Sequence, residues 1–200
     1  GRLGMPPFKS KVTNVKAIGQ LSANKVHIVV SNASGVNTVA DLKGKKFASQ
    51  PVGNVTTEAF KAVLAAVGLG EEDLQLTRGG QGFGAKEMKD RRIVGFTATT
   101  IPPSPAFSDV AQSLDVKFLG IDDKTFEAMK KENPGFVRDS IPANTYRGQG
   151  EAVQTASSAM IIVVNEAMHG EHAYWITKTL REYISSMQRL HTAWGRRTVK

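Results

Sequence analysis

The stretch Asp41–Leu69, DLKGKKFASQPVGNVTTEAFKAVLAAVGL, reads as a strand, a polar loop and a helix in direct succession. We expect the strand at residues 46–49 and the loop at residues 50–57. The helix that follows carries apolar residues at the i, i+3, i+4, i+7 spacing of a core-facing stripe: Phe60, Val63, Leu64 and Val67. Gly68 ends the helix, where a left-handed residue is commonly needed. This order predicts the edge of an α/β sheet.

The loop before this helix predicts a corner that accepts an anion. The first amides of a helix have no partner within the helix, and the helix dipole favours negative charge there. Asn54 or Thr56 can cap the helix and still offer a side chain to a ligand. An ordinary helix cap at a sheet edge explains the same residues, so the loop alone leaves both interpretations open.

The composition excludes several classes of protein. Among 200 residues, 40% are hydrophobic and 22% are charged, which is typical of a globular chain. No run of 18 apolar residues occurs, so we expect no membrane span. The absence of cysteine excludes disulfides, thiolate metal sites and cysteine nucleophiles.

The net charge of +8 raises nucleic acid as a partner. The basic residues are spread over three segments, 43–46, 86–92 and 196–200, and no aromatic residues interleave them as stacking platforms. We therefore expect a solvated basic surface and no nucleic-acid partner. His169 and His172 lack an acidic or sulfur ligand at a recognisable spacing, so we expect surface histidines, no metal site and no cofactor.

The rest of the chain alternates apolar strands with amphipathic helices. Residues 15–30 read as two strands separated by a turn at residues 22–25, and His27 lies inside the second strand as a structural residue. Further strands are expected at 74–77, 93–100, 116–121 and 157–164, the last of them buried. Helices are expected at 86–90, 104–114 and 126–132, with an irregular or extended connection over 135–155. A long helix closes the chain, with an inner face formed by Ile176, Leu180, Tyr183, Ile184, Met187 and Leu190.

Gly80–Ala85 matches the GxGxxA variant of a dinucleotide-binding motif, between a strand and a helix. The helix predicted after it is too short for a standard crossover, and no acidic residue follows at the distance expected for a ribose contact. We therefore expect no nucleotide at this stretch.

Hydroxyl side chains end the strand at 93–100. In open α/β sheets, ligands gather outside the carboxyl ends of strands, so Thr99 and Thr100 can face the same cleft as Asn54 and Thr56. The chain shows no nucleophile–base arrangement, no pair of carboxylates among apolar residues and no Walker loop. Polar loops at strand ends without a reacting group indicate a binding protein and not an enzyme.

Four segments carry a resemblance to the TAXI family of TRAP-transporter solute receptors. Residues 26–45 match a VHIVV…SG…VADLKGK block, and residues 51–56 stand where the family has an APGSGT-like loop. Thr99 and Pro103 fit a strand end followed by proline, and Ile141–Gln149 is similar to IPAGTYPGQ. Departures from the pattern are Asn54 and Val55 in place of Ser and Gly, and Thr100-Ile101 in place of Ala-Gly.

The resemblance implies a type II periplasmic-binding-protein fold of two α/β lobes joined by hinge crossings. Residues 1–37 would form part of lobe one and the hinge strands, 38–140 lobe two, and 141–200 the return crossing and the end of lobe one. The amino-terminal part of the family's chain has no counterpart here, so lobe one would be incomplete. Its apolar surface would then be exposed, and a homodimer through that surface is an expectation.

The resemblance also implies an extracytoplasmic or periplasmic receptor that binds a small carboxylate, an amino acid or a dicarboxylate, between two lobes. Its partners would be that anionic solute and the membrane components of a TRAP transporter. The ligand-binding residues would be Gly53, Asn54, Val55, Thr56, Thr99, Thr100 and Tyr146. Tyr146 covers the solute or has a structural role at the hinge. The alternative function is a ligand-sensing regulatory domain of the same fold.

Overall fold

The computed structural model describes residues 10–190 of the chain, which divide into two units. The larger unit is continuous, Asn24–Ser158, and the smaller one joins the described residues before Asn24 to those from Ala159 onward. The larger unit contains residues 24–37 and 141–158, which fall in the segments expected to supply the hinge strands and the return crossing.

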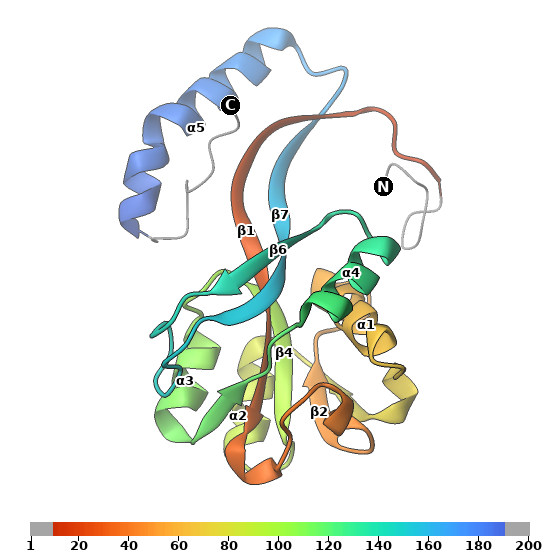
Figure 1. Cartoon of the computed structure of the whole chain (residues 1–200). Coiled ribbons are helices and arrows are strands. Elements are labelled where there is room, and N and C mark those ends of the chain that lie inside the picture. Colours follow the sequence, from red (N-terminus) through yellow and green to blue (C-terminus); the bar gives the residue numbers. More distant parts are fainter. Residues whose placement is uncertain (1–9, 191–200) are drawn as a thin grey trace. The chain divides into compact units, whose positions relative to one another are not determined.

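The described elements alternate along the chain as the sequence patterns predict (Figure 1). The strands are β1 (Val15–Ser31), β2 (Lys46–Ser49), β3 (Gln75–Arg78), β4 (Gly95–Thr100), β5 (Val116–Phe118), β6 (Phe136–Ile141) and β7 (Val153–Asn165). The helices are α1 (Val55–Ala66), α2 (Gln81–Lys89), α3 (Pro105–Ser113), α4 (Asp123–Glu132) and α5 (Gly170–Leu190). Single 3-10 turns occupy 32–34, 40–42 and 71–73.

Two expectations about elements are wrong. The turn at residues 22–25 does not form, because β1 runs unbroken through it, with Lys25 paired to Thr100 of β4. Residues 135–155 are irregular or extended as expected, and their extended part is β6, which pairs with β7 along its whole length. Helix α2 begins at Gln81 and not near residue 86, so most of the glycine-rich stretch is helical.

Strand order in the described sheet is β3-β2-β4-β1-β7-β6, with β5 also paired to β1. β2 runs parallel to both β3 and β4, whereas β1 is antiparallel to β4. Because β2, β3 and β4 share one direction, their carboxyl ends lie at one edge of the sheet.

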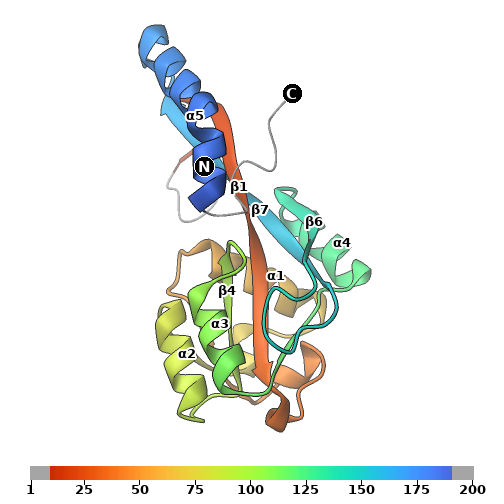
Figure 2. The same cartoon turned by 90° about the vertical axis from the view of Figure 1, so that its left-hand side faces the viewer.

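Helices cover both faces of the sheet in the larger unit (Figure 2). On one face, α1 and α4 pack against alternate residues of β1 and β2, and the Phe60 ring stacks on Phe47 at 5.2 Å between centroids. On the other face, α2 and α3 pack against β4, and the Phe107 ring stacks on Phe96 at 4.7 Å. The predicted stripe of α1 is confirmed, since Phe60, Val63 and Leu64 are fully buried and Val67 packs beside them.

The smaller unit leaves apolar side chains exposed. The expectation of a buried strand at 157–164 is wrong beyond residue 158, because side chains then alternate between exposed and half-buried. Ile161 and Val163 are at least half exposed. Ile176 and Tyr183 of α5 are also exposed, although we expected both on an inner face. The side chains of Ile184, Met187 and Leu190 lie outside the described part of the chain.

Candidate functional site

The carboxyl edge of the parallel strands gathers most of the residues that the sequence singled out. β2 ends at Ser49, β3 at Arg78 and β4 at Thr100, and helices α1, α2 and α3 begin just beyond this edge. Their N-termini give the edge a positive electrostatic character.

Asn54 caps α1 as predicted. Its Oδ1 accepts a hydrogen bond from the Thr56 amide at 2.8 Å. Gly53, just before the cap, has φ +87°, a conformation that a side chain would strain. Val55, the first helical residue, is 43% exposed, so its side chain lies at the surface.

Thr56 joins this helix start to strand β4. Its buried Oγ1 accepts a hydrogen bond from the backbone amide of Thr99 at 2.8 Å. The prediction that Thr56 and Thr99 lie together is therefore supported by a direct contact. The next residue, Thr57, donates its hydroxyl to the carbonyls of Gln50 and Pro51 and holds the loop closed.

Four buried side-chain polar atoms have no hydrogen-bond partner among the described residues: Ser49 Oγ, Thr99 Oγ1, Asn24 Oδ1 and Glu71 Oε1. The Glu71 carboxylate is bound to Arg78 through its other oxygen, which leaves Ser49, Thr99 and Asn24 as the neutral residues of this group. Ser49 lies two residues after Phe47 and therefore on the α1 face of the sheet. Thr99 lies on the same face, where its amide meets Thr56. A buried polar group without a partner is costly, so atoms of this kind point to a ligand or to water.

Thr100 differs from Thr99, although the sequence grouped them. Side chains alternate along a strand, so Thr100 lies with Phe96 and Ala98 on the α2–α3 face. The structure therefore brings Thr99 to the helix start of α1 and directs Thr100 to the other face.

Tyr146 is 4% exposed and belongs to the core on the α2–α3 face. Its ring stacks on Phe118 at 4.7 Å, and its hydroxyl accepts from the Ser104 amide at 3.0 Å and contacts Nε2 of His27 at 3.0 Å. Burial raises the pKa of Tyr146 to about 12. Of the two roles expected for Tyr146, covering the solute or supporting the structure, this placement favours the structural role.

His27 is a fully buried structural residue, as expected. Nδ1 contacts the Lys25 carbonyl at 2.8 Å, and the ring packs 4.7 Å from that of Phe107. Burial lowers the pKa of His27 to about 4, so the ring is neutral at pH 7.

The charged side chains near the edge are already paired. Lys25 Nζ donates to Asp139 Oδ1 at 2.8 Å and to the Ser140 carbonyl, in a half-buried ion pair. Burial alone would raise the pKa of Asp139, but the hydrogen bonds from Lys25 and the Ser140 amide lower it. Arg78 binds Glu71 and the Gln50 carbonyl. An anion at this edge would therefore form hydrogen bonds with hydroxyl and amide groups, because Lys25 and Arg78 are already paired.

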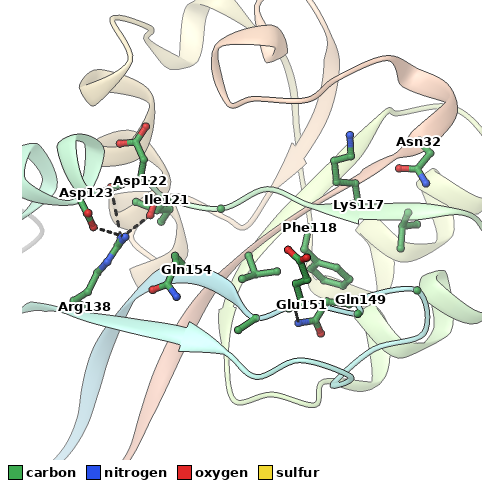
Figure 3. A pocket seen from close by; sticks show the side chains of 16 residues that line it. Asn32, Lys117, Phe118, Ile121, Asp122, Asp123, Arg138, Gln149, Glu151 and Gln154 are labelled. Atoms are coloured by element: carbon green, nitrogen blue, oxygen red, sulfur yellow. Dashed lines mark hydrogen bonds and ion pairs between the residues drawn. The ribbon is translucent and has the colours of Figure 1, made fainter.

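A cavity of about 740 Å³ lies elsewhere, along β5 and the loop before β7 (Figure 3). Its polar side chains are largely engaged. Arg138 binds the Ile121 carbonyl and Asp123, and Gln149 donates to the Glu151 carbonyl at 2.7 Å. The unpartnered atoms of Ser49 and Thr99 do not line this cavity, and we assign it no ligand.

Ser49 and Asn24 are candidate site residues that the sequence analysis did not select. The rule that selected Thr99, a hydroxyl at the carboxyl end of a predicted strand, applies equally to Ser49 at the end of residues 46–49. Asn24 had no such signal, because the expected turn at 22–25 placed it in a loop.

Metal and membrane hypotheses find no support in residues 10–190. No cluster of three metal-binding side chains occurs there, and His169 and His172 are exposed with ring centroids 5.9 Å apart. Within the same residues, no helix has the length and hydropathy that crossing a membrane requires.

The fold is that of periplasmic solute-binding proteins. The chain superposes on the periplasmic aliphatic sulphonate binding protein SsuA from Escherichia coli with a TM-score of 0.52 and 17% identity, over 88% of this chain and 51% of that one. A periplasmic binding protein from Brucella ovis with glutathione bound matches with a TM-score of 0.51 and 10% identity, over 88% and 44% of the two chains. Tv2483 bound to L-arginine also has a TM-score of 0.51, with 10% identity over 90% and 60%.

Residues 2–199 match the model of the NMT1-like family, and the chain belongs to that family. The predicted class, an α/β fold of the periplasmic-binding-protein type, is confirmed. Two of these matched proteins are themselves periplasmic binding proteins. The chain spans about half the length of these matched proteins.

Proposed function

We propose that this chain is the ligand-binding part of an extracytoplasmic solute receptor of a TRAP-type transporter, of the TAXI kind. The resemblance of Ile141–Gln149 and residues 26–45 to that family supports the transporter type. Membership of the NMT1-like family and the periplasmic-binding-protein fold support the receptor role. Its partners would be a small carboxylate and the membrane components of the transporter.

One observation carries the proposal. Ser49 and Thr99 are 2% and 7% exposed, and their hydroxyl oxygens have no partner among the described residues although they lie at the carboxyl edge of the sheet. Leaving such groups unpaired costs about 1–3 kcal/mol each. If a ligand pairs with these two hydroxyls when it binds, the cost is recovered in the complex. A binding site therefore explains why the unpaired hydroxyls are present.

The ligand would be held without a full positive charge. Hydroxyls of Ser49 and Thr99 donate to a carboxylate, and the start of α1 behind Asn54 adds the positive end of its dipole. Gly53 and Asn54 shape the loop, Val55 flanks it at the surface and Thr56 holds Thr99 in place. Thr100 and Tyr146 support this edge from the other face of the sheet.

The test compares two isosteric substitutions on one strand. Thr99→Val removes an unpartnered hydroxyl, whereas Thr97→Val removes a hydroxyl that donates to the His27 carbonyl at 2.8 Å. We expect Thr99→Val to weaken binding of a carboxylate such as aspartate or succinate at least about tenfold, the loss of one hydrogen bond to a charged group. Calorimetric titration measures the affinity.

The control variant, Thr97→Val, separates an effect on ligand affinity from an effect on stability. Thr97→Val should lower the stability by about 1 kcal/mol and leave the affinity within about twofold. Thr99→Val should leave the stability unchanged or raised, because it removes an unsatisfied group. Unchanged affinity in Thr99→Val would overturn the assignment of the site.

A further inference from the structure

The third unpartnered atom at the edge differs from the other two in its chemistry. Ser49 Oγ and Thr99 Oγ1 can donate, whereas Asn24 Oδ1 is only an acceptor. An acceptor cannot stabilise a carboxylate oxygen, so a simple anion site leaves the unpaired Oδ1 of Asn24 unexplained.

Asn24 lies on the same face of the sheet as the other two atoms. Val26 pairs directly with Thr99 across β1 and β4, and its side chain packs in the core under α1. Asn24 precedes Val26 by two residues, which places its side chain on that same face, roughly 7 Å further along the strand. The edge thus presents two donors on β2 and β4 and one acceptor on β1.

The neighbours of Asn24 do not use this acceptor. Ser22, on the same face of β1, contacts the Met160 sulfur at 3.8 Å, and Lys25 donates to Asp139 and Ser140. Thr155 donates to the Val26 carbonyl at 2.7 Å. Ser22, Lys25 and Thr155 are therefore paired with other groups, and Asn24 Oδ1 has no partner among the described residues.

We propose that Asn24 is a specificity-determining residue that accepts a hydrogen bond from a donor on the ligand beside its carboxylate. This inference rests on the proposed function and refines it. Asn24 selects acids that carry an N–H donor over acids of the same carbon skeleton without one. An acid that lacks the donor leaves Oδ1 buried and unpaired, and a site built to bind a donor discriminates strongly against such an analogue.

The test uses two matched pairs of acids as probes: aspartate with succinate, and alanine with propionate. In calorimetric titrations of the wild-type chain, we expect the amino-bearing member of each pair to bind at least about tenfold more tightly. Asn24→Leu, which keeps the size and removes the acceptor, should reduce that preference to less than about twofold. Asn14→Leu changes an exposed asparagine just before β1 and should retain it.

The outcomes separate this inference from the function on which it rests. Binding of the acids without a preference for the amino-bearing members, or a preference that survives Asn24→Leu, would overturn the role of Asn24 and leave the proposed receptor function standing. Failure of all four acids to bind the folded wild-type chain would overturn both. Circular dichroism of each variant establishes that it is folded.

Discussion

At the residue scale, two kinds of buried polar group occur within a few residues of each other. Thr97 and His27 are buried and fully paired, and they hold β1, β4 and the loop of Tyr146 together. Ser49 and Thr99 are equally buried and unpaired. The first kind contributes stability, and the second kind points to a ligand or to ordered water.

His27 makes the stability depend on pH. Its pKa is about 4 in the folded chain and near 6.5 unfolded, so the unfolded chain binds the proton first as pH falls. The contribution of neutral His27 to the free energy of unfolding is therefore fully present above pH 6.5. It is lost progressively between pH 6.5 and about 4, by about 3 kcal/mol in all.

Urea unfolding at pH 7 and pH 4.5 measures this dependence. His27→Gln, which cannot titrate, should lose less stability between the two values than the wild-type chain does. His169→Gln changes an exposed histidine and should follow the wild type. An unaltered pH dependence in His27→Gln would contradict the buried, neutral state of this ring.

At the element scale, helix α2 forms although its sequence contains glycine. Gly84 faces the sheet, and a Cβ there would lie 2.8 Å from the Phe96 ring. Gly82 has open space around the position of a Cβ. One glycine therefore permits close packing of α2 on β4, and the other only weakens the helix.

This difference predicts opposite effects for the same substitution. Gly84→Ala should destabilise the chain by about 1–3 kcal/mol through overpacking. Gly82→Ala should stabilise it by up to about 1 kcal/mol through helix propensity. Thermal unfolding followed by circular dichroism compares the two, and equal shifts in Tm would contradict the packing role of Gly84.

The cap of α1 gives a second prediction at this scale. Asn54→Ala removes the acceptor for the Thr56 amide and should cost about 1 kcal/mol of stability. Asn54→Ser keeps a capping oxygen and should recover most of that loss. Chemical denaturation measures both, and a fully stable Asn54→Ala variant would show that the cap is dispensable.

Periodicity predicted most elements because it reports burial directly. The α1 stripe and the apolar run 26–30 were read correctly for that reason. The turn at residues 22–25 was wrong, because Ser, Asn and Lys carry turn signals that pairing along β1 overrides. The start of α2 was misplaced because glycine signals a loop unless packing against the sheet stabilises the helix.

The candidate site was only partly predictable. Thr99 and Thr56 followed from the rule that ligands gather at carboxyl ends of strands, and the structure joins them through a hydrogen bond. Thr100 lies on the other face because side chains alternate along β4, and which face each residue takes depends on how the strand sits in the sheet. That Ser49 and Asn24 are unpaired depends on every neighbour, and no local pattern reports it.

At the scale of the whole molecule, the smaller unit presents an apolar surface. Val163 and Trp175 are 56% and 51% exposed, and Ile161 and Tyr174 add to the same set of exposed large side chains. Exposed apolar side chains in this number favour association. The expected homodimer through this surface stays a prediction.

Sedimentation velocity over a range of protein concentrations tests that prediction. We expect the wild-type chain to self-associate as its concentration rises, and Val163→Lys to shift the distribution toward the monomer. Val137→Lys alters another exposed valine, in the larger unit, and should not change it. A wild-type chain that stays monomeric throughout would exclude the dimer.

The central claim is that the carboxyl edge of the larger unit binds a small acid, and native mass spectrometry of the chain purified without denaturation tests it most directly. The claim predicts that the wild-type and Thr97→Val chains each carry one small carboxylic acid and that Thr99→Val is empty. A wild-type chain without a bound acid, even after aspartate or succinate is added, would contradict it, as would equal retention of the acid by Thr99→Val.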